Sequence, residues 1–241
     1  MSDTPAARPS AHPDLAVDLV GPDEGLGYRT KVETVQGSGG DLLIRSLLDR
    51  QQYFDPLGEA DRAGISSAAW PLFGMLWPSG RILAHVMQSF DLEGKHILEL
   101  GCGLGLASLV VHRRGGDITA SDNHPLAGEF MRRNVLLNLL PVMKYVIADW
   151  SQPSPPLARF DLIIGSDVLY DRGQPEALSQ FIERHASAAA QILIVDPDRG
   201  NRANFTRKMD VLGYSHTQTR LTALPGDGGA YKGRLLSYVR G

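Results

Sequence analysis

The sequence has little cysteine and no long apolar run. Cys102 is its single cysteine, so the 241-residue chain can form no internal disulfide and no cysteine-based structural zinc site, and it suits a reducing compartment. No stretch approaches the length of a membrane span, and residues 1–13 lack the basic start and apolar core of a signal peptide. We therefore expect a cytoplasmic protein that does not bind a membrane.

An excess of basic residues is also missing. The chain has 24 Lys+Arg against 27 Asp+Glu and a formal net charge of -3, which argues against nucleic acid as a partner. His112, His124 and His185 show no metal-ligand spacing, so we predict no metal. No Gly-x-Ser-x-Gly turn follows a strand, which argues against a serine hydrolase.

The chain does have the composition of an ordinary folded protein, with 43% hydrophobic and 21% charged residues. Its length suits one main α/β domain with an N-terminal addition. We expect a flexible leader at 1–27, where Pro, Ala, Asp and Gly are frequent, then a hairpin and helical extension at 28–94. The core domain is expected at 95–241.

From Lys95 onward, predicted strands and helices alternate, which is typical of parallel βαβ units. The predicted strands are 97–100, 117–121, 144–148, 160–165 and 191–195. The predicted helices are 106–114, 125–139, 174–190 and 201–212. Segments 214–221 and 234–239 predict a closing antiparallel strand pair, and segments 28–35 and 41–48 predict a separate N-terminal hairpin.

Residues 97–105, Ile-Leu-Glu-Leu-Gly-Cys-Gly-Leu-Gly, form the most informative motif: an apolar strand that ends in an acid and three alternating glycines. Gly101, Gly103 and Gly105 remove side chains where the backbone turns sharply, so a ligand can approach the amides at the start of the next helix. A dinucleotide fingerprint would place its last glycine or an alanine at position 106, where Leu106 stands. The motif predicts a nucleotide-binding loop whose glycine spacing differs from that of the dinucleotide fingerprint.

Acidic or aromatic side chains stand at or near five successive strand ends, namely Glu99, Asp122, Asp149 with Trp150, Asp167 and Asp196. Ligands of open parallel sheets bind at these ends. Asp122 lies about twenty residues beyond the loop and is placed to accept both ribose hydroxyls, although it or Asn123 could instead cap a helix. We expect Asp149 to accept an adenine amine and Trp150 to face the purine, the alternative being a core aromatic.

Two of these motifs resemble a known family. Glu99 and the three glycines resemble motif I of the class I S-adenosylmethionine methyltransferases, and Asp167-Val168-Leu169-Tyr170 resembles the Asp/Glu-x-x-Tyr motif of the seven-β-strand protein lysine methyltransferases. Further similarities to that group are Trp77-Pro78-Ser79-Gly80, Asp149-Trp150, and the pair Asn134 and Asn138. The resemblance covers roughly residues 70–212, the span of a typical domain.

The resemblance implies an α/β fold: a Rossmann-like three-layer sandwich with a mostly parallel seven-stranded sheet, an antiparallel C-terminal strand pair and a small N-terminal hairpin extension. It also implies S-adenosyl-L-methionine as cofactor and methyl transfer to a lysine amine of a protein substrate. Asp167 would position the cofactor's methionine end or the incoming ammonium, and Tyr170 would orient the amine. In the alternative interpretation, Asp167 caps a loop and Tyr170 packs under the following helix.

The cofactor contacts that we expect are Trp77, Glu99, Gly101, Cys102, Gly103, Gly105, Asp122, Asn123, Asp149, Trp150 and Ser166. Trp77 would cover the cofactor, or pack as a core aromatic. Cys102 is expected to be a small side chain packed in a tight turn rather than a nucleophile, because no histidine is placed near it in the motif.

The substrate stays open at this point. The segment 196–200, Asp-Pro-Asp-Arg-Gly, resembles part of the mitochondrial electron-transfer-flavoprotein methyltransferase branch and is a candidate substrate rim. The chain departs from that branch around the glycine loop, so its substrate does not transfer to this chain. A small-molecule amine or another protein side chain such as histidine is one alternative substrate, and a noncatalytic cofactor-binding interaction module is another alternative function.

Overall fold

The computed structural model describes residues 27–152, 157–226 and 228–241. The flexible leader predicted at 1–27 therefore lies outside the described residues, apart from Gly27.

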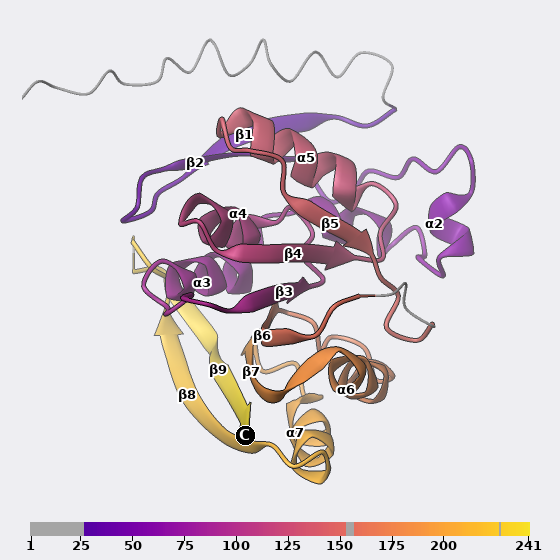
Figure 1. The fold of residues 1–241 in the computed structure, drawn as a ribbon. Coiled ribbons are helices and arrows are strands. Elements are labelled where there is room, and N and C mark those ends of the chain that lie inside the picture. The colour runs from indigo at the N-terminus through magenta and orange to yellow at the C-terminus, as the bar shows by residue number, and fades with distance from the viewer. Residues whose placement is uncertain (1–26, 153–156, 227) are drawn as a thin grey trace, which may run out of the picture.

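A single large sheet organises the described part of the chain, with seven strands in the order β5-β4-β3-β6-β7-β9-β8 (Figure 1). Its strands are β3 (His96–Leu100), β4 (Asp117–Asp122), β5 (Lys144–Ile147), β6 (Phe160–Ser166), β7 (Ala186–Asp196), β8 (Ser215–Ala223) and β9 (Ala230–Arg240). Neighbouring strands from β5 to β7 are parallel, whereas β9 is antiparallel to both β7 and β8. The mostly parallel sheet with its antiparallel C-terminal pair confirms the predicted fold class.

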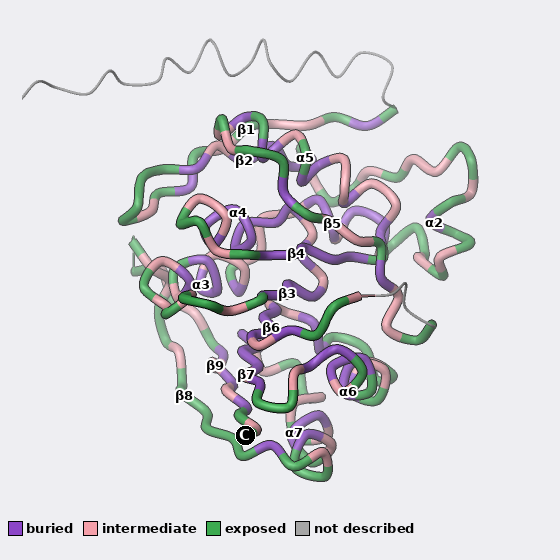
Figure 2. Tube along the Cα trace, in the orientation of Figure 1, coloured by how far each residue is buried: buried purple, intermediate pink, exposed green. Residues whose placement is uncertain are grey.

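Helices cover both faces of this sheet. They are α3 (Pro78–Met87), α4 (Leu106–Arg113), α5 (Ala127–Leu137), α6 (Gln174–His185) and α7 (Arg202–Val211). Alternate strand residues face opposite sides, so Ile97 joins one buried cluster with side chains of α3, α4 and α5, and Leu98 joins another with α6 and α7. Figure 2 shows burial concentrated along the central strands, while β8 at the sheet edge is largely exposed. The result is the three-layer sandwich that the resemblance implies.

The N-terminal extension forms the predicted hairpin from β1 (Thr30–Val35) and β2 (Leu42–Leu47), a two-stranded sheet that lies beside α5 (Figure 1). Two asparagines one helical turn apart join α5 to β2. Asn138 accepts a hydrogen bond from the Leu43 N–H (2.9 Å) and donates to its carbonyl (2.8 Å), and Asn134 accepts from the Arg45 N–H (2.7 Å). Their amides satisfy backbone groups of β2 that a neighbouring strand would otherwise pair.

The predicted helix 174–190 is too long, because α6 ends at His185 and β7 begins at Ala186. The Ala-Ser-Ala-Ala-Ala run at 186–190 has the composition of a helix, yet Ala186 pairs with Phe160 of β6 and Ala190 pairs with Arg240 of β9. Strand pairing on both sides outweighs the helix propensity of alanine at this position.

Two further elements lie between the hairpin and α3. They are α2 (Glu59–Arg62) and the 3-10 helix η1 (Trp70–Gly74), and neither is among the helices predicted from the sequence. Trp70 is buried and its ring meets those of Tyr28 and Phe73, so η1 is packed onto the core rather than extended over the surface.

Candidate active site

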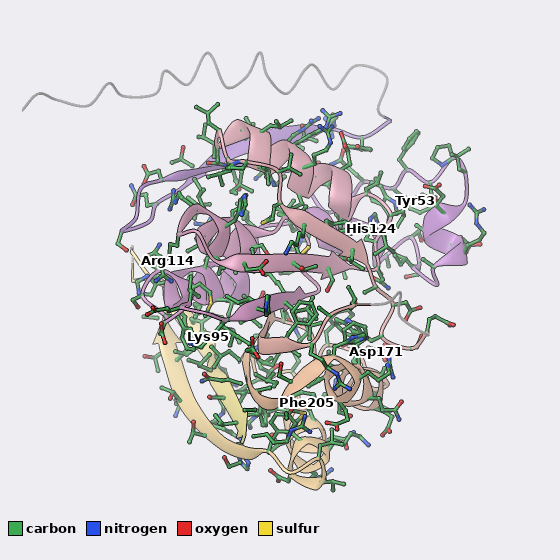
Figure 3. All side chains as sticks on the ribbon, viewed as in Figure 1. Tyr53, Lys95, Arg114, His124, Asp171 and Phe205 are labelled. Carbon is green, nitrogen blue, oxygen red and sulfur yellow. The ribbon has the colours of Figure 1, made fainter. Side chains whose placement is uncertain are left out.

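A cavity of about 640 Å³ opens at the carboxyl ends of the parallel strands. Its walls include the loops after β3, β4, β5 and β6 and the segment that carries η1. Figure 3 places His124 and Asp171, which both line the cavity, at the sheet end toward which the β4 and β5 arrows point, whereas Lys95 and Arg114 lie at the opposite end. The cavity therefore occupies the position at which open parallel sheets bind ligands.

Twelve of the thirteen site residues predicted from the sequence line this cavity; Gly105 does not. The lining members are Trp77, Glu99, Gly101, Cys102, Gly103, Asp122, Asn123, Asp149, Trp150, Ser166, Asp167 and Tyr170. Gly105 instead occupies the N-cap of α4 with a φ of 74°, and its N–H donates to the Cys102 carbonyl at 2.7 Å. Gly105 thus shapes the turn that the other residues depend on.

The glycine loop is held in a conformation that side chains disfavour. Gly101 and Gly103 have φ angles of 58° and 51°, in the left-handed region that glycine adopts without steric cost. A β-carbon on Gly101 would stand 3.1 Å from Val168 and 3.6 Å from Trp150, and one on Gly103 would stand 2.7 Å from the Phe73 carbonyl oxygen. The loop therefore presents bare backbone to the cavity and to η1.

Glu99 stabilises the first turn of the helix that follows this loop. Its buried carboxylate accepts hydrogen bonds from the Ser108 N–H (2.8 Å) and from the Ser108 hydroxyl. Burial raises the pKa of Glu99 to about 7, although both bonds from Ser108 act in the opposite direction. Glu99 is thus an internal support of the loop as well as part of the cavity wall.

Asp122 connects the ends of β3 and β4. One carboxylate oxygen accepts from the Gly103 N–H (2.8 Å) and the other from the His124 N–H (2.9 Å), and burial raises its pKa. The two oxygens offer about four acceptor sites, and the N–H groups of Gly103, His124 and Asn123 account for three of them, which leaves acceptor capacity for a ligand in the cavity. The alternative helix-cap interpretation is wrong, because α5 begins at Ala127 and its N-cap is Leu126.

His124 is a cavity residue that the sequence did not single out for this role. Its ring stacks on Phe73, with centroids 3.7 Å apart, and its Nδ1 accepts from the Leu126 N–H at 3.2 Å, so Nε2 carries the proton. Nε2 is buried without a hydrogen-bond partner in the part of the chain that the structure describes. Burial lowers the pKa of His124 to about 3, which keeps the ring neutral.

The predicted purine side of the cavity is formed by Asp149 and Trp150. Asp149 Oδ1 accepts from the Ser151 N–H (2.8 Å) and hydroxyl (2.7 Å), which fixes the turn after β5. The Trp150 ring lies beside Gly101, and its indole N–H is buried with no acceptor among the described residues. An unsatisfied donor on a cavity wall indicates a position where a ligand can supply the acceptor.

Trp77 and Cys102 complete the wall around the glycine loop. The Trp77 indole N–H donates to the Leu72 carbonyl at 2.8 Å, and the ring is partly buried at the cavity rather than enclosed in the core. Burial raises the pKa of the Cys102 thiol well above its usual value, so the thiol stays protonated and unreactive. This agrees with the expectation that Cys102 is a packed side chain.

The fourth-strand motif places Asp167 and Tyr170 on the opposite wall. Asp167 has a φ of 55°, its N–H donates to the Val195 carbonyl (2.9 Å), and its carboxylate is bound by Arg199 through two bonds of 2.7 Å each. The Tyr170 side chain is 54% exposed, so it does not pack beneath α6 as in the alternative interpretation. The role of Arg199 could be suspected only from the weak rim signal of segment 196–200.

No three His, Cys, Asp or Glu side chains within residues 27–152, 157–226 and 228–241 are grouped so that they could hold a metal ion. None of the helices in those ranges has the length and apolar character needed to cross a membrane.

Comparison with known proteins places the site in a family. The family model described as lysine methyltransferase matches residues 67–210, which include every cavity residue discussed above. A protein N-lysine methyltransferase of Danio rerio is 29% identical over 139 residues, covering 53% of this chain and 63% of the relative. A histidine protein methyltransferase 1 homolog of Dictyostelium discoideum is 34% identical over 103 residues, covering 41% of this chain and 33% of the relative.

The matched segment thus spans less than two thirds of either relative's length. A methyltransferase structure from Pyrococcus furiosus superimposes with a TM-score of 0.54 at 19% identity, covering 68% of this chain and 83% of that one, which supports the fold. Because the family model covers more than half of the residues and includes both the glycine loop and the Asp167-Tyr170 motif, the chain belongs to the lysine methyltransferase family.

Proposed function

We propose that this chain binds S-adenosyl-L-methionine at the carboxyl edge of its sheet and transfers the methyl group to a lysine side-chain amine of a protein. The observation that carries the proposal is the coincidence of the family match with the cavity: residues 67–210 supply both the glycine-loop wall and the Asp167-Tyr170 wall. The Danio rerio relative is a protein N-lysine methyltransferase, which supports the substrate class.

The residues present fit the cofactor. The glycine loop leaves bare backbone beside the cavity, Asp122 has spare acceptor capacity, and the Trp150 N–H needs an acceptor. We assign Gly101 and Gly103 to the backbone contacts, Asp122 to the ribose hydroxyls, and Asp149 with Trp150 to the adenine. A cavity of about 640 Å³ is within the usual range for a ligand of this kind.

The bound cofactor supplies a methyl group on a positively charged sulfur, which is an electrophile. A lysine amine has an ordinary pKa of about 10.4, so it arrives as an ammonium and must lose a proton before its lone pair can attack. Tyr170 is exposed at the cavity, where its hydroxyl can accept from or donate to the amine and fix its direction. Catalysis then rests on proximity, alignment and partial desolvation of the amine rather than on a strong base.

The second candidate substrate is a protein side chain other than lysine. Among such side chains, the Dictyostelium discoideum relative, a histidine protein methyltransferase homolog, favours histidine. A small-molecule amine and a noncatalytic binding module stay as further alternatives. We do not expect a nucleic-acid partner, because the net charge is -3. A cytoplasmic location stays a prediction that rests on the single cysteine.

Calorimetric titration of the protein with S-adenosylmethionine, S-adenosylhomocysteine and NAD tests the cofactor. Binding of the two adenosyl ligands without NAD supports the assignment, and no binding of either removes it. Transfer of labelled methyl groups into a cell extract then tests the substrate, with mass spectrometry of the labelled protein. Methyl-lysine supports the proposal, whereas methyl-histidine, or label confined to small molecules, selects one of the alternatives.

A further inference from the structure

Arg199 lies on the cavity wall, and its guanidinium binds the carboxylate of Asp167, the acid of the Asp/Glu-x-x-Tyr motif. Nε and Nη2 each lie 2.7 Å from a different oxygen of the Asp167 carboxylate, the two-pronged geometry of a strong arginine–carboxylate pair. The Asp167 backbone is fixed as well, through its N–H bond to Val195. Both partners line the cavity, so the pair is part of the wall that faces the substrate.

The pair is surrounded by other charged and titratable groups. Those from the neighbouring elements are Tyr170 and Asp171 after β6, Asp196 and Asp198 at and after the end of β7, Arg202 on α7, Tyr231 and Arg234 on β9, and Asp122 across the cavity. Asp198 has cations of its own, Arg202 at 3.6 Å and Arg234 at 3.3 Å. Asp196 is buried with one carboxylate oxygen unpartnered among the described residues.

The pKa of Arg199 is raised, chiefly by its hydrogen bonds to Asp167. An arginine at this position therefore stays charged at any pH at which the protein is folded. It offsets the charge of Asp167 in a region that holds more acids than cations.

This offset matters for an amine substrate. An unpaired carboxylate beside a lysine ammonium favours the charged form and raises the amine pKa by about 1–3 units. The ammonium has no free lone pair and cannot attack the methyl group. A carboxylate whose charge is offset by arginine still has lone pairs free, since about four acceptor sites exist and Arg199 uses two of them.

We propose that Arg199 is a positioning residue that holds the Asp167 carboxylate on the cavity wall and offsets its charge, so that the target amine meets a hydrogen-bond acceptor without being trapped as an ammonium. This inference rests on the proposed function. It assigns to segment 196–200 a part in setting the reactivity of the substrate amine, in addition to any role as a rim.

The pH dependence of three variants tests the inference. The rate of labelled methyl transfer from S-adenosylmethionine to the extract protein that the wild type labels is measured between pH 6.5 and 11, a range that includes the ordinary lysine pKa of about 10.4, with saturating cofactor and limiting extract. Arg199→Gln is expected to move the half-maximal pH upward by about one unit, which lowers the rate at pH 7 by about tenfold. The difference shrinks at high pH, because the amine is then deprotonated in both proteins.

Arg199→Lys keeps the positive charge and loses the two-pronged geometry, so it is expected to keep the wild-type half-maximal pH with a lower rate throughout. Arg202→Gln is the matched control, because Arg202 is a nearby cation that pairs with Asp198 and bonds Gln218 rather than Asp167. It is expected to follow the wild-type profile. Calorimetry with S-adenosylhomocysteine and thermal unfolding accompany each variant.

An Arg199→Gln profile that is lowered equally at every pH overturns the inference, since that result indicates only a structural role. A Lys variant that shifts as far as the Gln variant overturns it too, because charge would then not be the cause. Weakened S-adenosylhomocysteine binding with an unshifted profile assigns Arg199 to the cofactor instead. If the wild type binds the cofactor but labels no lysine, the proposed function fails first, and the inference with it.

Discussion

The carbonyl oxygen of Phe73 stands 2.7 Å from the point that a β-carbon on Gly103 would occupy. The N-terminal 3-10 helix therefore rests directly on the glycine loop, and the loop can accept it only because residue 103 has no side chain. Phe73 also stacks on His124, whose N–H donates to the same Asp122 carboxylate that accepts from Gly103. The extension, the glycine loop and the end of β4 thus form one connected wall of the cavity.

Replacing Gly103 by alanine is expected to disturb this wall. The added β-carbon meets a backbone atom, and the φ of 51° is strained for alanine, so we expect a loss of about 2–3 kcal/mol of unfolding free energy and at least tenfold weaker S-adenosylhomocysteine binding. Urea denaturation and calorimetry measure the two effects. Gly115→Ala is the matched control, because Gly115 has a φ of 80° with nothing within 4 Å of its β-carbon position. It should lose only about 1 kcal/mol and bind normally; equal losses in both variants would contradict the contact with Phe73.

Asp122→Ala should weaken cofactor binding. The variant loses the proposed acceptor for the ribose hydroxyls and the bond that holds Gly103, so we expect the dissociation constant of S-adenosylhomocysteine to rise by at least about tenfold. Asp117→Ala is the control: Asp117 begins the same strand at its other end and pairs with Lys144 at 2.7 Å. Unchanged affinity in the Asp122 variant would refute the ribose assignment.

The sequence predicted the sheet and most of the cavity because both depend on local patterns. Apolar strands, the glycine loop and an acid or aromatic at each strand end are all readable within a few residues, and parallel strands bring their ends together without further information. The helix predicted at 186–190 was wrong because the conformation there does not follow from a local pattern. The segment is extended because it pairs with β6 and β9, and the alanines themselves do not determine this.

Contacts between residues that are distant in sequence could not be predicted either, because they too depend on the tertiary structure. Asn134 and Asn138 could be recognised as family features, yet their bonds to β2 span 89 and 95 residues. Arg199 contacts Asp167 across 32 residues. His124 follows Asp122 directly, but its stacking on Phe73 depends on where η1 settles. Each of these contacts is created by the tertiary structure.

Tyr170→Phe should separate binding from turnover. The ring stays in place but the hydroxyl that would direct the amine is lost, so we expect cofactor affinity within about twofold of wild type and methyl transfer lowered by about tenfold, the worth of one hydrogen bond. Tyr53→Phe is a suitable control, because Tyr53 is similarly exposed at 52% and lies in the N-terminal extension. A Tyr170 variant with wild-type turnover would remove the hydroxyl from the mechanism.

Glu99 should make the folded protein less stable as the pH rises, which is the opposite of what a carboxyl group with a lowered pKa does. Its folded pKa is raised to about 7 from an ordinary 4.5, so between these values the folded chain keeps a proton that the unfolded chain has released. Stability should therefore fall as the pH rises from 4.5 to 7. Urea denaturation of Glu99→Gln should show a smaller fall over this range than the wild type. Parallel curves for the two proteins would mean that Glu99 has the same pKa in the folded and the unfolded chain.

His124 should act in the opposite direction. Its pKa is about 3 in the folded protein and ordinarily 6.5, so between these values the unfolded chain binds a proton that the folded chain does not. Stability is then lost as the pH falls below 6.5, by about 1.4 kcal/mol for each pH unit. His124→Asn keeps an acceptor for the Leu126 N–H but cannot titrate, so its unfolding free energy relative to wild type should improve steadily from pH 6.5 to 4.5. A constant difference between the two proteins would show that His124 takes up a proton while folded, and that its ring is not sealed between Phe73 and the end of β4.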